Sequence, residues 1–448
     1  MLSRPLVVLA FSALMVQLAV FALVYAVTSA KQLPFPSLTG DSNHYRILAE
    51  NLLQKKAFDT FPNMYSPESF RTPGYPAFLA VLHLFFRKWV IVALFQALLM
   101  TLVPVLSYIL ATRLFGSTVG LITGLLVAFD PIRLFYSTIT LSDTFFSLLF
   151  IWSLLLLVPR GEASTLKRLG FAGVLLGIAI LVRPIGQFLP IIFLSYLFLA
   201  KVSWHQFAKE AVVFLFGVLI IVTPWAMRNK VTFDSWQLSS VGSFNAAYFT
   251  MLYLKETTGA NPDSLQHQIV QRVGSDDLGL LRSVAGGELS LAFARSVVVE
   301  HPLGYLWFHA VKTIPFFLSD GIRDSARLLG IYNPALPNFS GMLLHGQFKD
   351  FLSALWGDGV SLMMLLLGGG SMALAILLGI VGFVRGLLGK VTKMPTVFFT
   401  VLILYFAVLT GPVANARYRI PVMPLLAILA GVGAQVVWRG LKRRGLYP

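Results

Sequence analysis

The chain has 448 residues, of which 57% are hydrophobic and 12% are charged, and its formal net charge is +16. Soluble proteins carry about twice that share of charged residues, so the composition excludes a soluble domain and predicts an all-α polytopic membrane protein. The absence of cysteine excludes disulfides and thiolate chemistry. We attribute the positive charge to cytoplasmic loops and anionic membrane lipids, not to nucleic-acid binding.

Ten apolar stretches are candidates to cross the bilayer, which takes about 20 residues. They are roughly residues 5–29, 90–112, 117–136, 143–159, 169–182, 185–200, 208–226, 360–384, 394–412 and 420–438. The first stretch is longer than the apolar part of a signal peptide, usually about 7–15 residues, so we expect it to be retained. Residues 73–88 and 301–318 are apolar but interrupted by Pro, His or Lys. We expect both to lie at the outer membrane surface, with a crossing by 301–318 as the open alternative.

The distribution of basic residues predicts the orientation. If the N-terminus is cytoplasmic, most Lys and Arg residues in short joints and tails fall on the cytoplasmic side, as the positive-inside rule requires. These residues are Arg4, Arg113, Arg160, Lys167, Arg168, Lys201, Lys209, Arg385, Lys390, Lys393, Arg439, Lys442, Arg443 and Arg444. Both termini are then cytoplasmic. Within a single membrane domain of residues 1–448, two long segments, 30–89 and about 227–358, lie outside, and 360–438 supplies the last spans.

Charged residues recur at the expected outer ends of the spans. They are Asp41, Arg71, Asp130, Arg133, Asp143, Arg183, Arg228, Arg417 and Arg419. A charge at the membrane interface is a functional candidate because its desolvation is costly. Arginine binds phosphate bidentately and stays charged. Several arginines and a few carboxylates at one membrane level therefore predict a cleft for a lipid phosphate, such as a polyprenyl phosphate.

Each acid also has a simpler interpretation. Asp41 precedes a helical pattern and could cap its N-terminus. Asp143, or Ser142 before it, could cap the apolar run that follows. Asp130 stands before Pro131 and could cap a turn.

The basic residues have structural alternatives as well. Arg133, Arg183 and Arg228 could extend from the bundle to the membrane interface, and the pair Arg417 and Arg419 could do the same. His44 could be an ordinary helix-surface residue.

Two motifs in the first outer segment resemble a known family. The stretches "GDSNHYRILAENLL" (40–53) and "FRTPGYPAFLAVLHLFF" (70–86) are similar to the first outer loop of bacterial GT-C-type glycosyltransferases, in the branch of protein O-mannosyltransferases and lipid A aminoarabinose transferases. Further similarities follow in the family's order. They are "RLFG" (113–116), "LSDTFFSLLF" (141–150), "LVRPIG" (181–186), "TPWAMRN" (223–229), "EHPLGYLWF" (300–308) and "ARYRIPVMPLLAILAG" (416–431).

The resemblance implies a transferase that moves a sugar from a polyprenyl-phosphate donor to a protein, lipid or glycan acceptor at the outer face of a bacterial inner membrane. Asp41 would be the base or a metal ligand, and Asp143 stands where the family usually has Glu. The phosphate would be held by Arg71, Arg183, Arg417 and Arg419. Supporting residues would be Tyr45, His44, Asp130 and Arg228. A single displacement at the anomeric carbon would invert it.

The resemblance leaves a divalent cation open, because metal dependence varies within the family. If Mg²⁺ or Mn²⁺ is needed, Asp41 and Asp143 are its candidate ligands, although His44, three residues from Asp41, does not make a metal motif. Two other functions are the alternatives. A lipid-linked substrate transporter or flippase would favour charges near the midplane and repeat symmetry, and a polysaccharide ligase or polymerase would leave the Asp41 motif unexplained.

Overall fold

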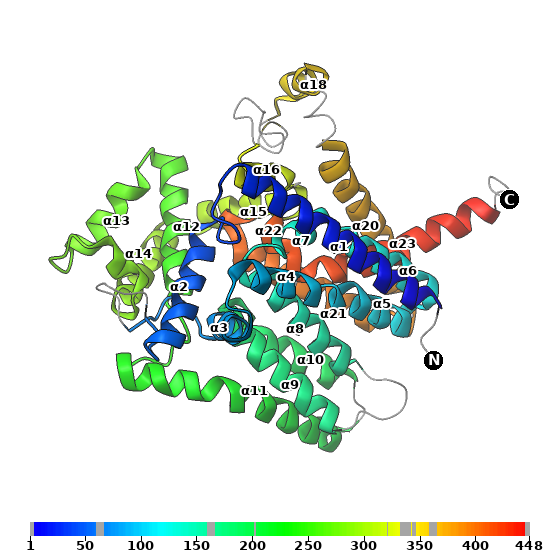
Figure 1. The fold of residues 1–448 in the computed structure, drawn as a ribbon, viewed down its shortest axis with the longest axis horizontal. Coiled ribbons are helices and arrows are strands. Elements are labelled where there is room, and N and C mark those ends of the chain that lie inside the picture. Colours follow the sequence, from blue (N-terminus) through cyan, green and yellow to red (C-terminus); the bar gives the residue numbers. More distant parts are fainter. Residues whose placement is uncertain are drawn as a thin grey trace.

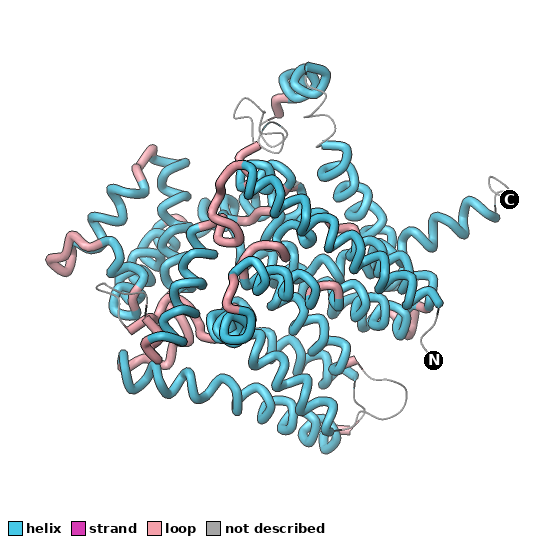
Figure 2. The backbone as a smooth tube through the Cα atoms, viewed as in Figure 1, coloured by secondary structure: helices cyan, strands magenta, loops and turns pink. Residues whose placement is uncertain are grey.

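The computed structural model describes residues 4–59, 67–158, 166–200, 203–319, 321–331, 342, 346–357 and 365–443. These residues form α-helices and short 3-10 and π turns, with no β-strand among them (Figure 1, Figure 2). The predicted all-α membrane class is confirmed. Arg160, Lys201, Arg444 and the start of the expected span 360–384 lie outside the described residues.

The first half of the chain builds most of the helical bundle. In chain order its helices are α1 (Arg4–Ala30), α2 (Gly40–Gln54), α3 (Gly74–Phe86), α4 (Trp89–Leu99), α5 (Leu102–Phe115), α6 (Ser117–Ala128), α7 (Pro131–Tyr136), α8 (Ser142–Leu157), α9 (Leu166–Val182), α10 (Leu189–Ala200) and α11 (Trp204–Phe233). Helix α1 packs on α4, α5 and α6, and α9 lies between α8 and α11 (Figure 1).

The second half begins with a layer outside the bundle and then returns to it. Its helices are α12 (Val241–Thr258), α13 (Pro262–Gln271), α14 (Val284–Glu300), α15 (Pro302–Leu318), α16 (Ile322–Leu328), α18 (Phe348–Gly357), α20 (Ser371–Leu388), α21 (Lys393–Thr410), α22 (Ala416–Arg419) and α23 (Met423–Arg443). In Figure 1, α12, α13 and α14 lie together at one end of the molecule beside α2, away from the chain termini. We call these three helices the outer layer.

Six helical segments of the described chain are long and apolar enough to span a membrane. They are Arg4–Ala30, Trp89–Phe115, Trp204–Phe233, Gly368–Leu388, Lys393–Val413 and Ala416–Lys442. The other four expected spans contain helices of 17 residues or fewer, namely α6, α8, α9 and α10. The segments 73–88 and 301–318 do form helices, α3 and α15. The total of ten crossings, the side on which each end lies and the path of α15 stay predictions.

The expected span 117–136 is broken at Asp130. Helix α6 ends at Ala128, and α7 begins at Pro131, which has no backbone N–H to continue the helical hydrogen bonds. An Asp130 oxygen accepts the Ile132 N–H at 3.1 Å. The capping interpretation of Asp130 is therefore confirmed.

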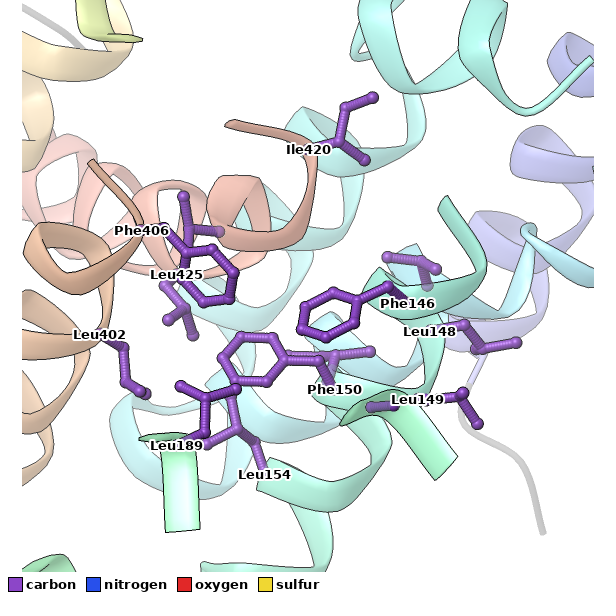
Figure 3. Close-up of a cluster of buried hydrophobic side chains, with 14 of the residues drawn as sticks. Phe146, Leu148, Leu149, Phe150, Leu154, Leu189, Leu402, Phe406, Ile420 and Leu425 are labelled. Atoms are coloured by element: carbon purple, nitrogen blue, oxygen red, sulfur yellow. The ribbon is translucent and has the colours of Figure 1, made fainter. Parts of the chain in front are cut away.

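Aromatic side chains fill the centre of the bundle. Phe146 and Phe150, one turn apart on α8, meet Phe406 of α21 with ring centroids 5.8 and 5.5 Å apart (Figure 3). All three are at most 1% exposed. Edge-to-face pairs of this kind contribute about 0.5–1.5 kcal/mol beyond the area they bury. This packing fixes α8, whose first turn carries Asp143.

Small residues bring the last helices into backbone contact. A Cβ atom added to Gly382 of α20 would lie 1.9 Å from the carbonyl oxygen of Leu429, and one added to Gly433 of α23 would lie 1.9 Å from that of Leu378. Close approach at small residues is a common way for membrane helices to associate. The contact anchors α23, which follows the chain segment that carries Arg417.

The outer layer has its own hydrophobic core. Buried side chains of α12, α13 and α14 pack on one another and on α15, among them Met251, Val270, Phe293 and Phe308. The layer joins the loop before α3 through Ser240, whose N–H donates to the Ser69 carbonyl at 3.0 Å. The outer layer thus lies next to the outer segment 30–89, which holds the motifs at 40–53 and 70–86.

Candidate functional site

Asp41 lies in the first turn of α2 but does not cap it. The N-cap is Thr39, whose Oγ1 accepts the Ser42 N–H at 3.0 Å. The capping interpretation of Asp41 is therefore wrong. Its carboxylate instead accepts from Arg71 Nη2 at 2.5 Å on Oδ1 and from Arg417 Nη2 at 3.1 Å on Oδ2.

Asp143 is held in the same way at the start of α8. The N-cap position is Leu141, and neither Ser142 nor Asp143 caps the helix, so that interpretation is also wrong. The Asp143 side chain is fully buried, and it forms ion pairs with Arg183 Nη1 and with Arg417 Nε, the latter at 2.9 Å. A buried carboxylate needs such partners, because an unpaired charge in the interior is very costly.

These five residues form one continuous network, which we call the charged cluster: Asp41, Arg71, Asp143, Arg183 and Arg417. They come from five chain segments far apart in sequence. Three guanidinium groups face two carboxylates, so the cluster has a net charge of +1 when all five are ionised. An anion such as a phosphate would complete its charge balance.

The electrostatics of Asp41 follow from this pairing. Burial alone would raise the pKa of Asp41, but the charges of Arg71 and Arg417 and their hydrogen bonds hold it well below its usual range. Asp41 is therefore ionised at neutral pH. Its main effect in this arrangement is to hold the two guanidinium groups in place.

A large cavity of about 1020 Å³ lies over the charged cluster. Asp41, Arg71, Arg183 and Arg417 line it from the bundle side. The outer layer and the turn between α13 and α14 also line it, with Asn245, Gln266 and Arg282. Polar side chains from both parts of the molecule therefore line the cavity.

A second, more apolar cavity of about 420 Å³ adjoins the first. Both cavities are lined by Arg71, Arg183 and Tyr418. The second continues over apolar side chains such as Phe188 and Phe249. The arginines thus stand where a polar space meets an apolar one.

Of the expected supporting residues, Tyr45 and His44 reach the site. The Tyr45 hydroxyl lies 3.1 Å from Ser142 Oγ and accepts from Arg71 Nη1 at 3.4 Å. His44 lines the larger cavity, and its Nε2 lies 3.0 Å from Glu68 Oε2. His44 is therefore more than a helix-surface residue.

Arg419 lies away from the charged cluster. It is 3% exposed, and it donates to the carbonyl oxygens of Phe316 at 2.7 Å, Phe317 at 3.1 Å and Ser319 at 3.0 Å. These carbonyls belong to the C-terminal end of α15, so Arg419 satisfies a helix end. This position does not agree with the expected phosphate contact of Arg419.

Two further arginines also have structural contacts. Arg228 donates to the backbone carbonyl of Glu68 at 2.9 Å. Its guanidinium carbon lies 4.7 Å from the ring centroid of Trp225. Arg133 is 2% exposed and donates to the carbonyls of Val127 and Ala128 at the end of α6. Arg133 is therefore a buried helix cap, and its interpretation as a residue that extends to the interface is wrong.

The sequence interpretation missed two residues at the site, Glu68 and Tyr418. Glu68 precedes the "RTPGYP" motif and is 3% exposed. The Tyr418 ring lies 5.8 Å from the Arg183 guanidinium and 5.7 Å from that of Arg417. An acid next to a motif was a usable signal for Glu68, whereas nothing in the spacing distinguished Tyr418.

The donor groups of the site do not fit a metal centre. Within the described residues, no three His, Cys, Asp or Glu side chains gather closely enough to hold an ion. Both carboxylates of the charged cluster already accept from guanidinium groups. We therefore derive no step through a metal.

Comparisons with known proteins agree with the sequence resemblance. Residues 71–227 match the family described as dolichyl-phosphate-mannose-protein mannosyltransferase. A search of curated proteins finds no significant match. Among solved structures, the Archaeoglobus fulgidus oligosaccharyltransferase in complex with Zn and sulfate covers 98% of this chain at 14% identity with a TM-score of 0.52. The chain and this oligosaccharyltransferase therefore share a fold.

Two further solved structures match this chain. AglB from Archaeoglobus fulgidus, in complex with an inhibitory peptide and a dolichol-phosphate, covers 96% of this chain at 13% identity with a TM-score of 0.50. The chain spans about half the length of these oligosaccharyltransferases, 50% and 51%. ArnT from Cupriavidus metallidurans bound to undecaprenyl phosphate matches at 14% identity over 95% of this chain and 77% of its own, with a TM-score of 0.40, too low to support an argument.

Proposed function

We propose that this protein transfers a sugar from a polyprenyl-phosphate donor to a hydroxyl acceptor on the outer face of a cell membrane, with both termini cytoplasmic. The observation that carries the proposal is the charged cluster, whose three arginines exceed its two carboxylates at the junction of a polar and an apolar cavity. A lipid phosphate matches this junction because its anionic head and its apolar tail need the two environments.

The donor phosphate is proposed to contact Arg71, Arg183 and Arg417. Each of these arginines lines the larger cavity, and each is already oriented by a carboxylate. Preorganised cations stabilise the negative charge that grows on a leaving phosphate and need no reorganisation during the reaction. One solved neighbour in fold contains a dolichol-phosphate, which supports the same class of ligand here.

The acceptor is proposed to enter through the larger cavity, between the charged cluster and the outer layer. Its hydroxyl oxygen attacks the anomeric carbon, and the bond from that carbon to the phosphate oxygen breaks. The electron pair of that bond leaves with the polyprenyl phosphate, and the hydroxyl proton of the acceptor passes to a base in the site. Because the oxygen attacks from the side opposite the leaving phosphate, a single displacement inverts the anomeric centre. No general acid is required, because a phosphate is a good leaving group, in contrast to the leaving group of a glycosidase.

The test is sugar transfer by the purified 448-residue chain in liposomes. The donors are radiolabelled polyprenyl-phosphate mannose and polyprenyl-phosphate aminoarabinose, and the acceptors are a Ser/Thr peptide, lipid A and a membrane glycan extract. We expect label to move from the donor to one acceptor class and free polyprenyl phosphate to appear. Failure of every pair, in protein that is shown to be folded, would contradict the proposal.

Arg183→Ala is the variant that tests the phosphate site. Arg183 lines both cavities and contacts Asp143. We expect weaker binding of a synthetic polyprenyl monophosphate and a lower transfer rate. The control is Arg323→Ala, in α16 outside both lining sets. Equal polyprenyl-phosphate affinity in the two variants would count against the arginines as the phosphate site. Movement of intact donor across the bilayer without transfer would favour a flippase instead.

A further inference from the structure

Asp41 is poorly suited to take the acceptor proton. Its Oδ1 accepts from Arg71 at 2.5 Å and its Oδ2 from Arg417 at 3.1 Å, so both oxygens are engaged. The same contacts keep the pKa of Asp41 well below its usual range, against the opposing effect of burial. A general base is most effective when its pKa lies near the working pH. The acceptor proton therefore needs another destination.

A second basic group lies one turn further along α2. His44 follows Asp41 by three residues, a spacing that places both side chains on one face of the helix. Both line the 1020 Å³ cavity. The His44 side chain is 20% exposed, and its Nε2 lies 3.0 Å from Glu68 Oε2. The imidazole therefore meets the cavity while one of its nitrogens is held by a carboxylate.

Glu68 is fixed in the position that this contact requires. Its side chain is 4% exposed. Its Oε1 accepts the backbone N–H groups of Phe70 at 2.5 Å and Arg71 at 3.0 Å. Burial alone would raise the pKa of Glu68, but the hydrogen bond and charge of His44, with those two backbone hydrogen bonds, lower it below its usual value. The group beside His44 is thus a carboxylate, which accepts hydrogen bonds and does not donate them.

This carboxylate decides which nitrogen of His44 can act. In a neutral imidazole, one nitrogen carries a hydrogen and the other has a free lone pair. Glu68 accepts the Nε2 hydrogen, so the lone pair lies on Nδ1. Among the described residues, His44 makes no other side-chain hydrogen bond. A base that is oriented by a carboxylate is the general arrangement for activating a hydroxyl nucleophile.

We propose that His44 is the general base of the transfer reaction and that Glu68 is its positioning residue; this rests on the glycosyltransferase function proposed above. The acceptor oxygen forms its bond to the anomeric carbon while its hydrogen passes to Nδ1 of His44. The bond between the anomeric carbon and the phosphate oxygen breaks, and its electrons stay on the phosphate. The resulting imidazolium is stabilised by Glu68 and later releases its proton to water. Asp41 keeps Arg71 and Arg417 in place.

The pH dependence of kcat/KM is the main readout. The charged groups that line the cavity around His44 are Asp41, Glu68, Arg71, Arg183, Arg282 and Arg417. The arginines stay charged at all working pH values, and carboxylates ordinarily titrate below about pH 5. If a neutral imidazole takes the acceptor proton, kcat/KM falls on the acidic side of the pH profile, where the imidazole is already protonated. Because His309 lines the second cavity, the comparison with His44→Ala decides which histidine causes this limb. We expect this limb in the wild type and its absence in His44→Ala.

The variants separate a catalytic histidine from a structural one. The assay uses polyprenyl-phosphate mannose or aminoarabinose, whichever the wild type transfers. We expect His44→Ala to lower kcat by about 10²–10⁴-fold, with little change in affinity for a synthetic polyprenyl monophosphate. Added imidazole should restore part of the rate. Glu68→Gln should lose less rate than His44→Ala, because the histidine stays in place but the carboxylate that stabilises its imidazolium is gone.

The controls keep the outcomes distinct. His267→Ala removes an exposed histidine of α13 that lines neither cavity and should behave as the wild type. If His44→Ala does not fold, His44→Gln keeps an amide that can donate to Glu68 and is assayed instead.

Three results would overturn the assignment. One is an unchanged rate and pH limb in the His44 variant, which would leave the transferase function standing. Another is a requirement of the wild type for Mn²⁺ or Mg²⁺, together with a higher half-saturating metal concentration in the His44 variant. That result would make His44 a metal ligand. The third is absence of transfer by the wild type with every donor, which would remove the proposed function and this inference together.

Discussion

Arg417 donates its Nε hydrogen to Oδ2 of Asp143 at 2.9 Å. The other end of the same guanidinium reaches Asp41 at 3.1 Å. One planar group therefore connects the start of α2 with the start of α8, two helices that are distant in sequence. Lysine reproduces this bridge poorly, because its three donors share one nitrogen, whereas the guanidinium presents Nε and Nη2 at separate positions in a rigid plane.

Replacement of Arg417 should separate charge from geometry. Arg417→Lys keeps the charge but loses the rigid pair of separated donors, so we expect transfer to fall by about 10²–10³-fold, the cost of one preorganised donor. Arg417→Ala should also lower the free energy of unfolding by about 3–5 kcal/mol, because the buried Asp143 loses a partner. Transfer assays and melting temperatures in detergent check both. A fully active lysine variant would show that the bridge is dispensable.

The two buried acids should respond differently to the same change. Asp143→Asn leaves Arg183 and Arg417 without their shared carboxylate, so we expect lower transfer and a lower melting temperature. Asp130→Asn should keep transfer near the wild-type rate, because asparagine is as good an N-cap as aspartate and Asp130 accepts the Ile132 N–H at 3.1 Å. The transfer rates are compared per mole of folded protein. Similar losses in both variants would mean that Asp130 also belongs to the site.

Arg417 and Arg419 of the "ARYR" motif have different roles in the structure, which the sequence alone could not distinguish. On a helix, residues two apart point about 200° from each other, and α22 is a short helix, Ala416–Arg419. Arg417 therefore reaches the charged cluster while Arg419 reaches the end of α15. Charges at the ends of apolar spans predicted a site in this region. Which of the two arginines reaches it depends on local helix geometry.

Features that depend on local sequence were predictable, whereas contacts between residues distant in the sequence were not. The apolar spans were predictable because a membrane helix is defined by its own composition. The contact between Glu68 and His44 joins a loop to a helix across 24 residues, and no local pattern marks it. The N-caps of α2 and α8 also differed from expectation, because Thr39 and Leu141 occupy those positions. A difference of one or two residues there decided whether an aspartate caps a helix or enters the site.

Arg419→Ala should affect folding and not phosphate binding. Arg419 donates to three carbonyls at the end of α15, and a buried carbonyl that loses its donor costs about 1–3 kcal/mol. We therefore expect a lower melting temperature but an unchanged affinity of the folded fraction for a synthetic polyprenyl monophosphate. Thermal unfolding and lipid-phosphate binding are measured on one preparation. Reduced affinity at full folding would return Arg419 to the phosphate site.

Glu68 should make a pH-dependent contribution to stability. Its pKa in the folded protein lies below the ordinary value of 4.5, so the unfolded chain takes up the proton first as the pH falls. The stabilising contribution is complete above about pH 4.5 and is lost as the pH drops through the lower folded pKa. We expect Glu68→Gln to melt at a lower temperature than the wild type at pH 6, and the difference to shrink between pH 5 and pH 3.5. A constant difference over that window would contradict the assignment.

Two glycines of α20 give a matched test of the contact with α23. A Cβ atom at Gly382 would lie 1.9 Å from the backbone oxygen of Leu429, whereas one at Gly379 would meet nothing within 4 Å. Gly382→Ala must push α20 away from α23, and overpacking of this kind costs about 1–3 kcal/mol. Gly379→Ala should be neutral or stabilising, because alanine favours the helix by about 1 kcal/mol. We expect a lower melting temperature for Gly382→Ala and an equal or higher one for Gly379→Ala. Since α23 follows the segment that carries Arg417, Gly382→Ala should also lower transfer, and equal behaviour of the two variants would refute the close helix contact.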